Sequence, residues 1–162
     1  MNPFLKTSLP CLLIFFFCTF TVASCIAQLK DSQFLFDSTK AIKEVEQRNE
    51  IFLNAVRIGD SIALGNFYTV DAKIFNSGSP TTDGRDAIVK FYGRSIRAGI
   101  NNCTIITTGV WGSDNNLVVE EGTIDFLSSN GKTAAKGRYL LVWKRENGVL
   151  KIFRDSFSSD SR

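Results

Sequence analysis

The feature that most constrains the fold of this chain is a change of hydrophobic period near residue 100. Before it, in residues 39–58 and again in residues 84–99, apolar side chains recur every three or four positions, the spacing of amphipathic helices. After it, apolar and polar residues alternate, the spacing of half-buried strands. Four such strands are expected, at residues 103–112, 116–127, 134–146 and 149–158. Helices followed by a run of strands predict an α+β domain.

Turn chemistry indicates how these strands connect. The intervening segments read GSDNN, SSNGK and RENGV, and Asn147-Gly148 is a preferred two-residue hairpin turn. An antiparallel meander is therefore expected, preceded by a short second helix that Asp60 caps and by a strand in FYTVDAKIFNSG. A curved antiparallel sheet wrapped around the long N-terminal helix would form a cone. The opening of such a cone is a natural site for a small apolar ligand.

The first 24 residues have a different character. A start with one cation, Lys6, is followed by the apolar run CLLIFFFCTFTVA and by small residues, the layout of a secretory signal peptide. The letters VASC, ending at Cys25, also resemble the bacterial lipobox, in which Cys25 would be acylated; ordinary cleavage as late as residue 27 is the alternative. The expected organisation is a signal peptide at 1–24, a linker at 25–37 and one exported domain at 38–160. A lipid anchor would be its one membrane attachment.

Composition narrows the functions of such a domain. The formal net charge is only +3 and no dense Lys/Arg stripe appears, so nucleic-acid binding is not expected. The chain has no His, which removes Ser-His-Asp and Cys-His nucleophiles and imidazole metal sites. Of the four Cys, Cys11 and Cys18 belong to the signal peptide and Cys25 would be acylated or removed. Only Cys103 would remain, and its alternating surroundings favour a small buried side chain. No metal and no cofactor is expected.

Two segments of the chain contain short motifs in the order and spacing of a known protein family. The segment AVRIGDSIALGNFYTVDAKIFNSGSPTTDGRDAIVKFYG, and the later GRYLLVWKRENGVLKIFRDSFSS, resemble nuclear transport factor two-like proteins, including their SnoaL-like and ketosteroid isomerase-like branches. The resemblance covers residues 38 to 160. It implies a cystatin-like, cone-shaped α+β fold that is often a homodimer through the outer sheet face. It implies no single function, because this fold hosts enzymes, ligand binders and oligomerisation modules.

The resemblance also allows a test of the hypothesis that the domain is an isomerase. In the steroid isomerase branch a carboxylate on the first strand moves a proton while a Tyr of the first helix donates to the developing oxyanion. The matching positions here are Asn76 and Phe52, and neither side chain can do that chemistry. The dehydratase and cyclase branches commonly use His, which this chain lacks.

Other acids could replace the missing base. Glu121, Thr123 and Asp125 share one parity of a predicted strand, so Glu121 and Asp125 could be paired carboxylates if that face is concave. Alternatively, they lie on the solvated or dimer face, opposite Lys or Arg of neighbouring strands. Asp155 and Tyr139 are the remaining catalytic candidates.

Three hypotheses follow for the cone. In the first, it is an open pocket that binds a small apolar ligand or belongs to a dimeric module. In the second, it is the active site of a small isomerase or dehydratase. In the third, it is a purely structural core that Phe52, Tyr92 and Trp143 fill. Simple alternation along the last strand puts Ile152 and Arg154 on one face and Asp155 on the other. The residues expected at a ligand are Phe52, Asn76, Tyr92, Trp111, Tyr139 and Arg154.

Overall fold

The structure is a computed structural model that describes residues 36–160. The expectations for the signal peptide, its cleavage and acylation of Cys25 concern positions outside the described residues. In the described part of the chain, no helix is both long enough and apolar enough to cross a membrane.

Three helices form as the sequence predicts. Helix α2 spans Ser38–Ile58; it begins where the Asp37 carboxylate accepts a hydrogen bond from the Lys40 backbone N–H at 3.0 Å. It ends at Gly59, whose φ of 72° is the left-handed conformation that glycine adopts readily. Helix α3 (Ser61–Asn66) is capped by Asp60, and helix α4 spans Arg85–Arg97.

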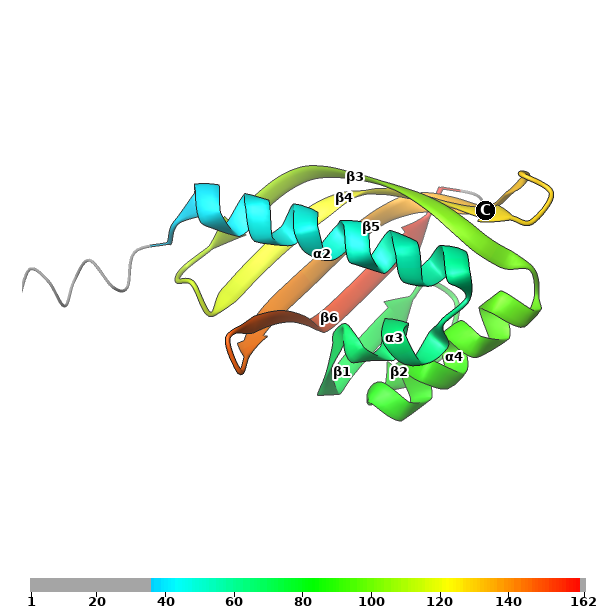
Figure 1. Ribbon diagram of the computed structural model, residues 1–162, viewed down its shortest axis with the longest axis horizontal. Coiled ribbons are helices and arrows are strands. Elements are labelled where there is room, and N and C mark those ends of the chain that lie inside the picture. The colour runs from blue at the N-terminus through cyan, green and yellow to red at the C-terminus, as the bar shows by residue number, and fades with distance from the viewer. Residues whose placement is uncertain (1–35, 161–162) are drawn as a thin grey trace, which may run out of the picture. The chain divides into compact units, whose positions relative to one another are not determined.

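The six strands form one curved sheet in the order β2-β1-β6-β5-β4-β3. Their bounds are Tyr68–Asn76 for β1, Thr82–Asp83 for β2, Ile100–Gly112 for β3, Leu117–Ser128 for β4, Thr133–Glu146 for β5 and Val149–Ser159 for β6. Figure 1 shows α2 lying across one face of the sheet, with α3 and α4 gathered near β1. This is the α+β arrangement expected from the change of period, with the helices on one face of a curved sheet.

The sheet differs from expectation in one respect. Strands β3 to β6 form the predicted antiparallel meander, but β1 pairs with β6 in parallel, so the sheet as a whole is mixed. The two-residue strand β2 then pairs with the outer edge of β1. Hairpin turns identify antiparallel neighbours from local sequence, whereas β1 and β6 meet across most of the domain and carry no local signal of their pairing.

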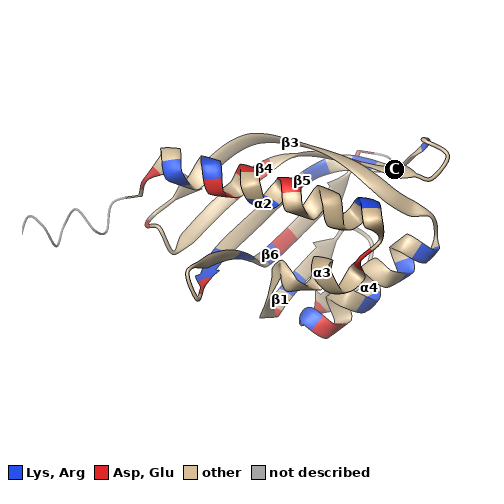
Figure 2. Ribbon diagram, viewed as in Figure 1, with Lys and Arg blue, Asp and Glu red and all other residues tan. Residues whose placement is uncertain are grey.

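The core lies between α2, α4 and the inner face of the sheet. Its fully covered side chains include Val45 of α2, Ile88 of α4, Val118 of β4 and Trp143 of β5. Charged side chains of both signs are interspersed along α2 and α4 (Figure 2). Burial of this apolar face, at about 25 cal/mol per Å², holds the helices on the sheet.

Candidate functional site

Two β-bulges determine which side chains face the inside of the curved sheet. In β3, Thr107 pairs with Gly122 and Gly109 with Glu121, so Thr108 is an extra residue. In β6, Ile152 pairs with Trp143 and Arg154 with Val142, so Phe153 is an extra residue. Each bulge places two consecutive residues opposite one residue of the partner strand. Beyond the bulge, the odd-numbered and even-numbered side chains exchange faces of the sheet.

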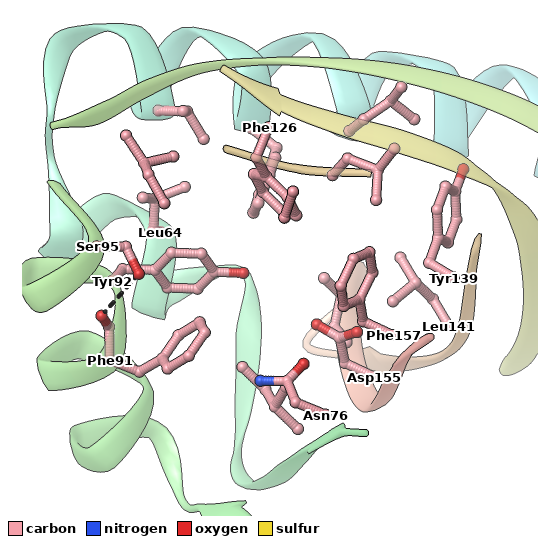
Figure 3. A pocket seen from close by; sticks show the side chains of 18 of the residues that line it. Leu64, Asn76, Phe91, Tyr92, Ser95, Phe126, Tyr139, Leu141, Asp155 and Phe157 are labelled. Atoms are coloured by element: carbon pink, nitrogen blue, oxygen red, sulfur yellow. Dashed lines mark hydrogen bonds between the residues drawn. The ribbon is translucent and has the colours of Figure 1, made fainter. Parts of the chain in front are cut away.

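The inner face encloses a cavity of about 340 Å³ beneath α2 and α4. Most of its lining is apolar, and Figure 3 shows these side chains pointing into a common space. The lining includes Phe52, Leu64, Phe91, Ile124, Phe126, Leu141 and Phe157. Phe52, Tyr92 and Trp143 therefore line the cone without filling it, and the expectation of a closed structural core is wrong.

Asp155 brings a carboxyl group into this apolar space. Its side chain points into the cavity from β6 (Figure 3). The Tyr68 hydroxyl of β1 donates a hydrogen bond to Asp155 Oδ2 at 2.7 Å and lies 2.7 Å from the Tyr92 hydroxyl of α4. Burial raises the pKa of Asp155 to about 6; the Tyr68 hydrogen bond opposes this rise, and the negative charge of Glu120 adds to it.

The direction of the hydrogen bonds follows from proton counting. An ionised carboxylate can only accept, so the single Tyr68 proton goes to Asp155. The Tyr92 hydroxyl must then donate to Tyr68, and its remaining lone pair is available as an acceptor. Burial raises the pKa of both Tyr68 and Tyr92 above the ordinary value, so both hydroxyls keep their protons at neutral pH.

A second carboxyl group, Glu120 of β4, lies behind the cavity wall. It is 0% exposed. Its Oε1 accepts hydrogen bonds from Asn49 Nδ2 at 2.7 Å, Thr107 Oγ1 at 2.8 Å and the Tyr139 hydroxyl at 2.7 Å. Its Oε2 accepts one from Trp143 Nε1 at 2.9 Å. This Glu120 network joins α2, β3, β4 and β5 through uncharged donors.

The structure brings most of the predicted ligand contacts together. Four of the six line the cavity, namely Phe52, Asn76, Tyr92 and Tyr139, and so does the catalytic candidate Asp155. Trp111 and Arg154 do not. Trp111 is 48% exposed, because the Thr108 bulge turns it to the outer face.

Arg154 lies outside the cavity because the Phe153 bulge turns it to the outer face of the sheet. Its guanidinium donates to the backbone oxygens of Phe153 and Asp71 and lies 3.5 Å from the centre of the Phe153 ring. The prediction that Arg154 and Asp155 point apart is confirmed. The prediction that Ile152 shares a face with Arg154 is wrong, because the Phe153 bulge puts Ile152 and Asp155 on the cavity side together.

The proposed carboxylate pair of Glu121 and Asp125 is also corrected. Neither residue lines the cavity, and Glu121 is exposed. Asp125 accepts from Lys136 Nζ at 3.3 Å across the strand pair, as the ion-pair alternative predicts. Glu121 and Asp125 directly follow the inward residues Glu120 and Ile124 along β4, so their side chains lie on the opposite face of the sheet, away from the pocket.

Sequence reasoning missed Glu120 and Tyr68. A usable signal existed for Glu120, because it shares its parity with Val118 and Ile124 and is therefore an acid in an apolar row. Tyr68 carries no comparable signal. Its role depends on the parallel pairing of β1 with β6, which sets Tyr68 opposite Ile152.

Comparison with known proteins connects this geometry to a known fold. No protein-family model and no curated protein matches the sequence. A cystatin-like-fold domain of unknown function from Nostoc punctiforme has 11% identity and a TM-score of 0.67, covering 78% of this chain and 81% of its own. A nuclear transport factor two-like protein with a cystatin-like fold from Novosphingobium aromaticivorans has 14% identity and a TM-score of 0.62, covering 86% of this chain and 90% of its own. The chain has the nuclear transport factor two-like fold.

Other proteins with this fold carry more specific names. A ketosteroid isomerase-like protein from Erwinia carotovora has 17% identity and a TM-score of 0.61, covering 74% of this chain and 96% of its own. At this identity the likeness establishes the nuclear transport factor two-like fold, and the function has to be argued from the pocket.

Proposed function

We propose that this domain binds a small, mainly apolar ligand that carries one polar group. The observation that supports the proposal is the Asp155 carboxyl in an otherwise largely apolar cavity, with Tyr68 and Tyr92 behind it. Pockets of this kind hold the ligand through apolar contact and orient it through a few polar groups.

The cavity volume limits the ligand size. A volume of about 340 Å³ is near the lower end for ligand pockets. It corresponds to roughly eleven water molecules at about 30 Å³ each. A ligand of about ten non-hydrogen atoms, such as one ring with a short chain, fits this space.

The environment of Asp155 supports binding more strongly than a structural role. Burying a charge is costly unless a cation or several hydrogen-bond donors compensate it. Glu120 accepts from four donors, as a structural acid requires, whereas Asp155 accepts from the Tyr68 hydroxyl. The raised pKa of Asp155 reflects burial that its hydrogen bond from Tyr68 does not offset. A perturbed carboxyl group in a cavity is a recurring mark of functional sites.

Proton transfer by Asp155 is a second candidate function. With a pKa of about 6, this carboxyl group can both accept and release a proton near neutral pH. An isomerase would also need a donor for the developing negative charge. The protons of Tyr68 and Tyr92 are directed toward Asp155, so the pocket supports binding better than enolisation.

A cavity-filling variant tests the binding function. Titration calorimetry with 4-phenylbutanol should give saturable binding to the full mature chain, and Ala135→Trp should reduce the affinity at least tenfold. Ala135 lines the cavity, whereas its neighbour Ala134 is exposed and outside the lining, so Ala134→Trp is the matched control. Undetectable binding of 4-phenylbutanol and of its amine and carboxylate analogues to the wild-type protein, or equal binding to the Ala135→Trp variant, would contradict the proposal.

We also propose that the domain is exported and forms a homodimer through the outer face of the sheet. Export is suggested by residues 1–24, with Cys25 or a later position as the mature N-terminus; intact mass of protein from its own host tests this. Three apolar side chains are exposed on strands β3 and β5: Ile106, Trp111 and Leu140. Exposed apolar side chains gathered on one face are typical of interaction surfaces.

A further inference from the structure

We propose that the natural ligand is a hydrophobic amine whose ammonium group pairs with the Asp155 carboxylate. This inference rests on the proposed binding function and specifies the charge of the ligand. It is drawn from three properties of the cavity: the sign of its charges, the direction of its hydrogen bonds and its aromatic lining.

The charges around the cavity are negative. Asp155 is the one charged side chain in the cavity lining within residues 36–160, and that lining contains no Lys or Arg. Glu120 lies behind the wall, where its contacts Tyr139, Asn49 and Trp143 form part of the lining. In such a poorly solvated space, charges interact more strongly than in water. The pocket therefore attracts a cation and repels an anion.

The hydrogen bonds of the wall leave acceptors for the ligand. The Tyr139 hydroxyl donates to Glu120, and the Tyr92 and Tyr68 hydroxyls donate along the chain that ends at Asp155. Their unused valences are lone pairs, like those of the Asp155 carboxylate. A ligand whose head group only donates meets this demand. An ammonium group has three donors and no acceptor.

Aromatic side chains complete the binding surface for a cation with an apolar body. Phe52 and Tyr92 pack edge to face with ring centres 5.9 Å apart, and Phe126 and Phe157 do so at the same separation. All four line the cavity. Aromatic faces attract cations and also pack against rings and alkyl chains.

The protonation of Asp155 makes the amine affinity depend on pH. The titratable groups that face it are Tyr68 of β1 and Tyr92 of α4, with Glu120 of β4 contributing its charge; Cys103 of β3 acts on Tyr92. Burial raises the pKa of Cys103 to about 12, so neither this thiol nor the tyrosines ionise below pH 8. An alkyl amine, like Lys, stays protonated throughout.

Three matched probes test the inference in the full mature chain. Titration calorimetry compares 4-phenylbutylamine, 4-phenylbutanol and 4-phenylbutyrate at pH 5.0 and pH 7.5. At pH 7.5 the amine should bind at least tenfold tighter than the alcohol, and the carboxylate should not bind. A pKa near 6 implies that the amine affinity rises about tenfold from pH 5.0 to pH 7.5, while the alcohol affinity does not rise.

Two isosteric variants assign the effect to one residue. Asp155→Asn should weaken the amine about 10- to 100-fold at pH 7.5, the loss expected for a charge-assisted hydrogen bond. It should also remove the amine's pH dependence. The control, Glu121→Gln, deletes an exposed acid on the outer face and should leave the affinity within twofold. Thermal unfolding checks that both variants fold, and the wild-type pH series tests the inference without any variant.

These experiments distinguish failure of the amine inference from failure of the proposed binding function. Binding of the alcohol as tightly as the amine at pH 7.5 would overturn the amine inference and leave the binding function standing. Preference for the carboxylate would do the same. An amine affinity unchanged by Asp155→Asn would refute the pairing, and absence of binding by all three probes would overturn both proposals.

Discussion

Replacing Glu120 by Gln should destabilise the domain by about 2–4 kcal/mol. The carboxyl group accepts from four donors, three at Oε1 and one at Oε2. A Gln side chain has nearly the same shape but only one acceptor oxygen. If that oxygen takes the Oε1 position, the Gln amide N–H groups face the Trp143 indole N–H. In the flipped orientation they face the donors at Oε1, which leaves more of them unsatisfied.

The magnitude follows from the better orientation. The buried Trp143 N–H loses its acceptor, which costs about 1–3 kcal/mol, and the Gln amide N–H groups that replace this acceptor are buried without a partner, which adds about 1 kcal/mol. Trp143 is 1% exposed, so water cannot replace the lost acceptor without opening the core. The sum is a large share of the roughly 5–15 kcal/mol that stabilises a typical domain.

Urea unfolding followed by tryptophan fluorescence measures this effect. The midpoint should fall with an unchanged denaturant slope, since the mutation alters stability and not the surface exposed on unfolding. Glu121→Gln is the matched control, because the neighbouring acid is exposed on the opposite face and should change stability by about 0.5 kcal/mol or less. Equal stabilities of the two variants would refute the argument that the Glu120 network holds the inner face together.

Two further predictions concern pH and assembly. The pKa of Asp155 rises from 3.8 to about 6 on folding, so the folded state binds the carboxyl proton more tightly than the unfolded state does. The stabilisation from this proton is complete below about pH 4 and is lost as the pH rises through 6. The free energy of unfolding of the wild type, relative to that of Asp155→Asn, should therefore fall by about 2–3 kcal/mol between pH 4 and pH 7; a constant difference would contradict the burial argument. Leu140→Glu, at a side chain 45% exposed on the outer face, should convert the proposed dimer to a monomer in light scattering without loss of pocket binding, and a monomeric wild type would refute the proposed dimer.

Sequence patterning predicted the elements of this fold well because their signals are local. The bounds of α2, Ser38–Ile58, lie within one residue of the expected 39–58, and the hairpin turn forms at Asn147-Gly148 as expected. Both depend on short-range chemistry. Half-buried strands also reveal themselves by alternation. The parallel pairing of β1 with β6 depends on contacts between distant segments, which no local pattern encodes.

The pocket was predicted less completely, for a specific physical reason. Alternation assigns faces correctly only while the register is regular, and the bulges at Thr108 and Phe153 interrupt it. Trp111 therefore lies outside the pocket, and Ile152 shares the cavity side with Asp155. Residues of α2 and α4, such as Phe52 and Tyr92, were placed correctly because the helical stripe has no such interruption.

The bulge in β6 has a consequence for evolutionary comparison. Phe153 is an additional residue facing outward, so a related chain that lacks it would run Ile152, Arg154, Asp155 in regular alternation and still present the same acid to the cavity. Thr108 occupies the corresponding place in β3. Alignments of distant homologues should accordingly open a single-residue gap at these two points. A gap-free alignment would match the cavity-facing acid of one protein to an outward residue of the other, and conserved pocket chemistry would be mistaken for divergence.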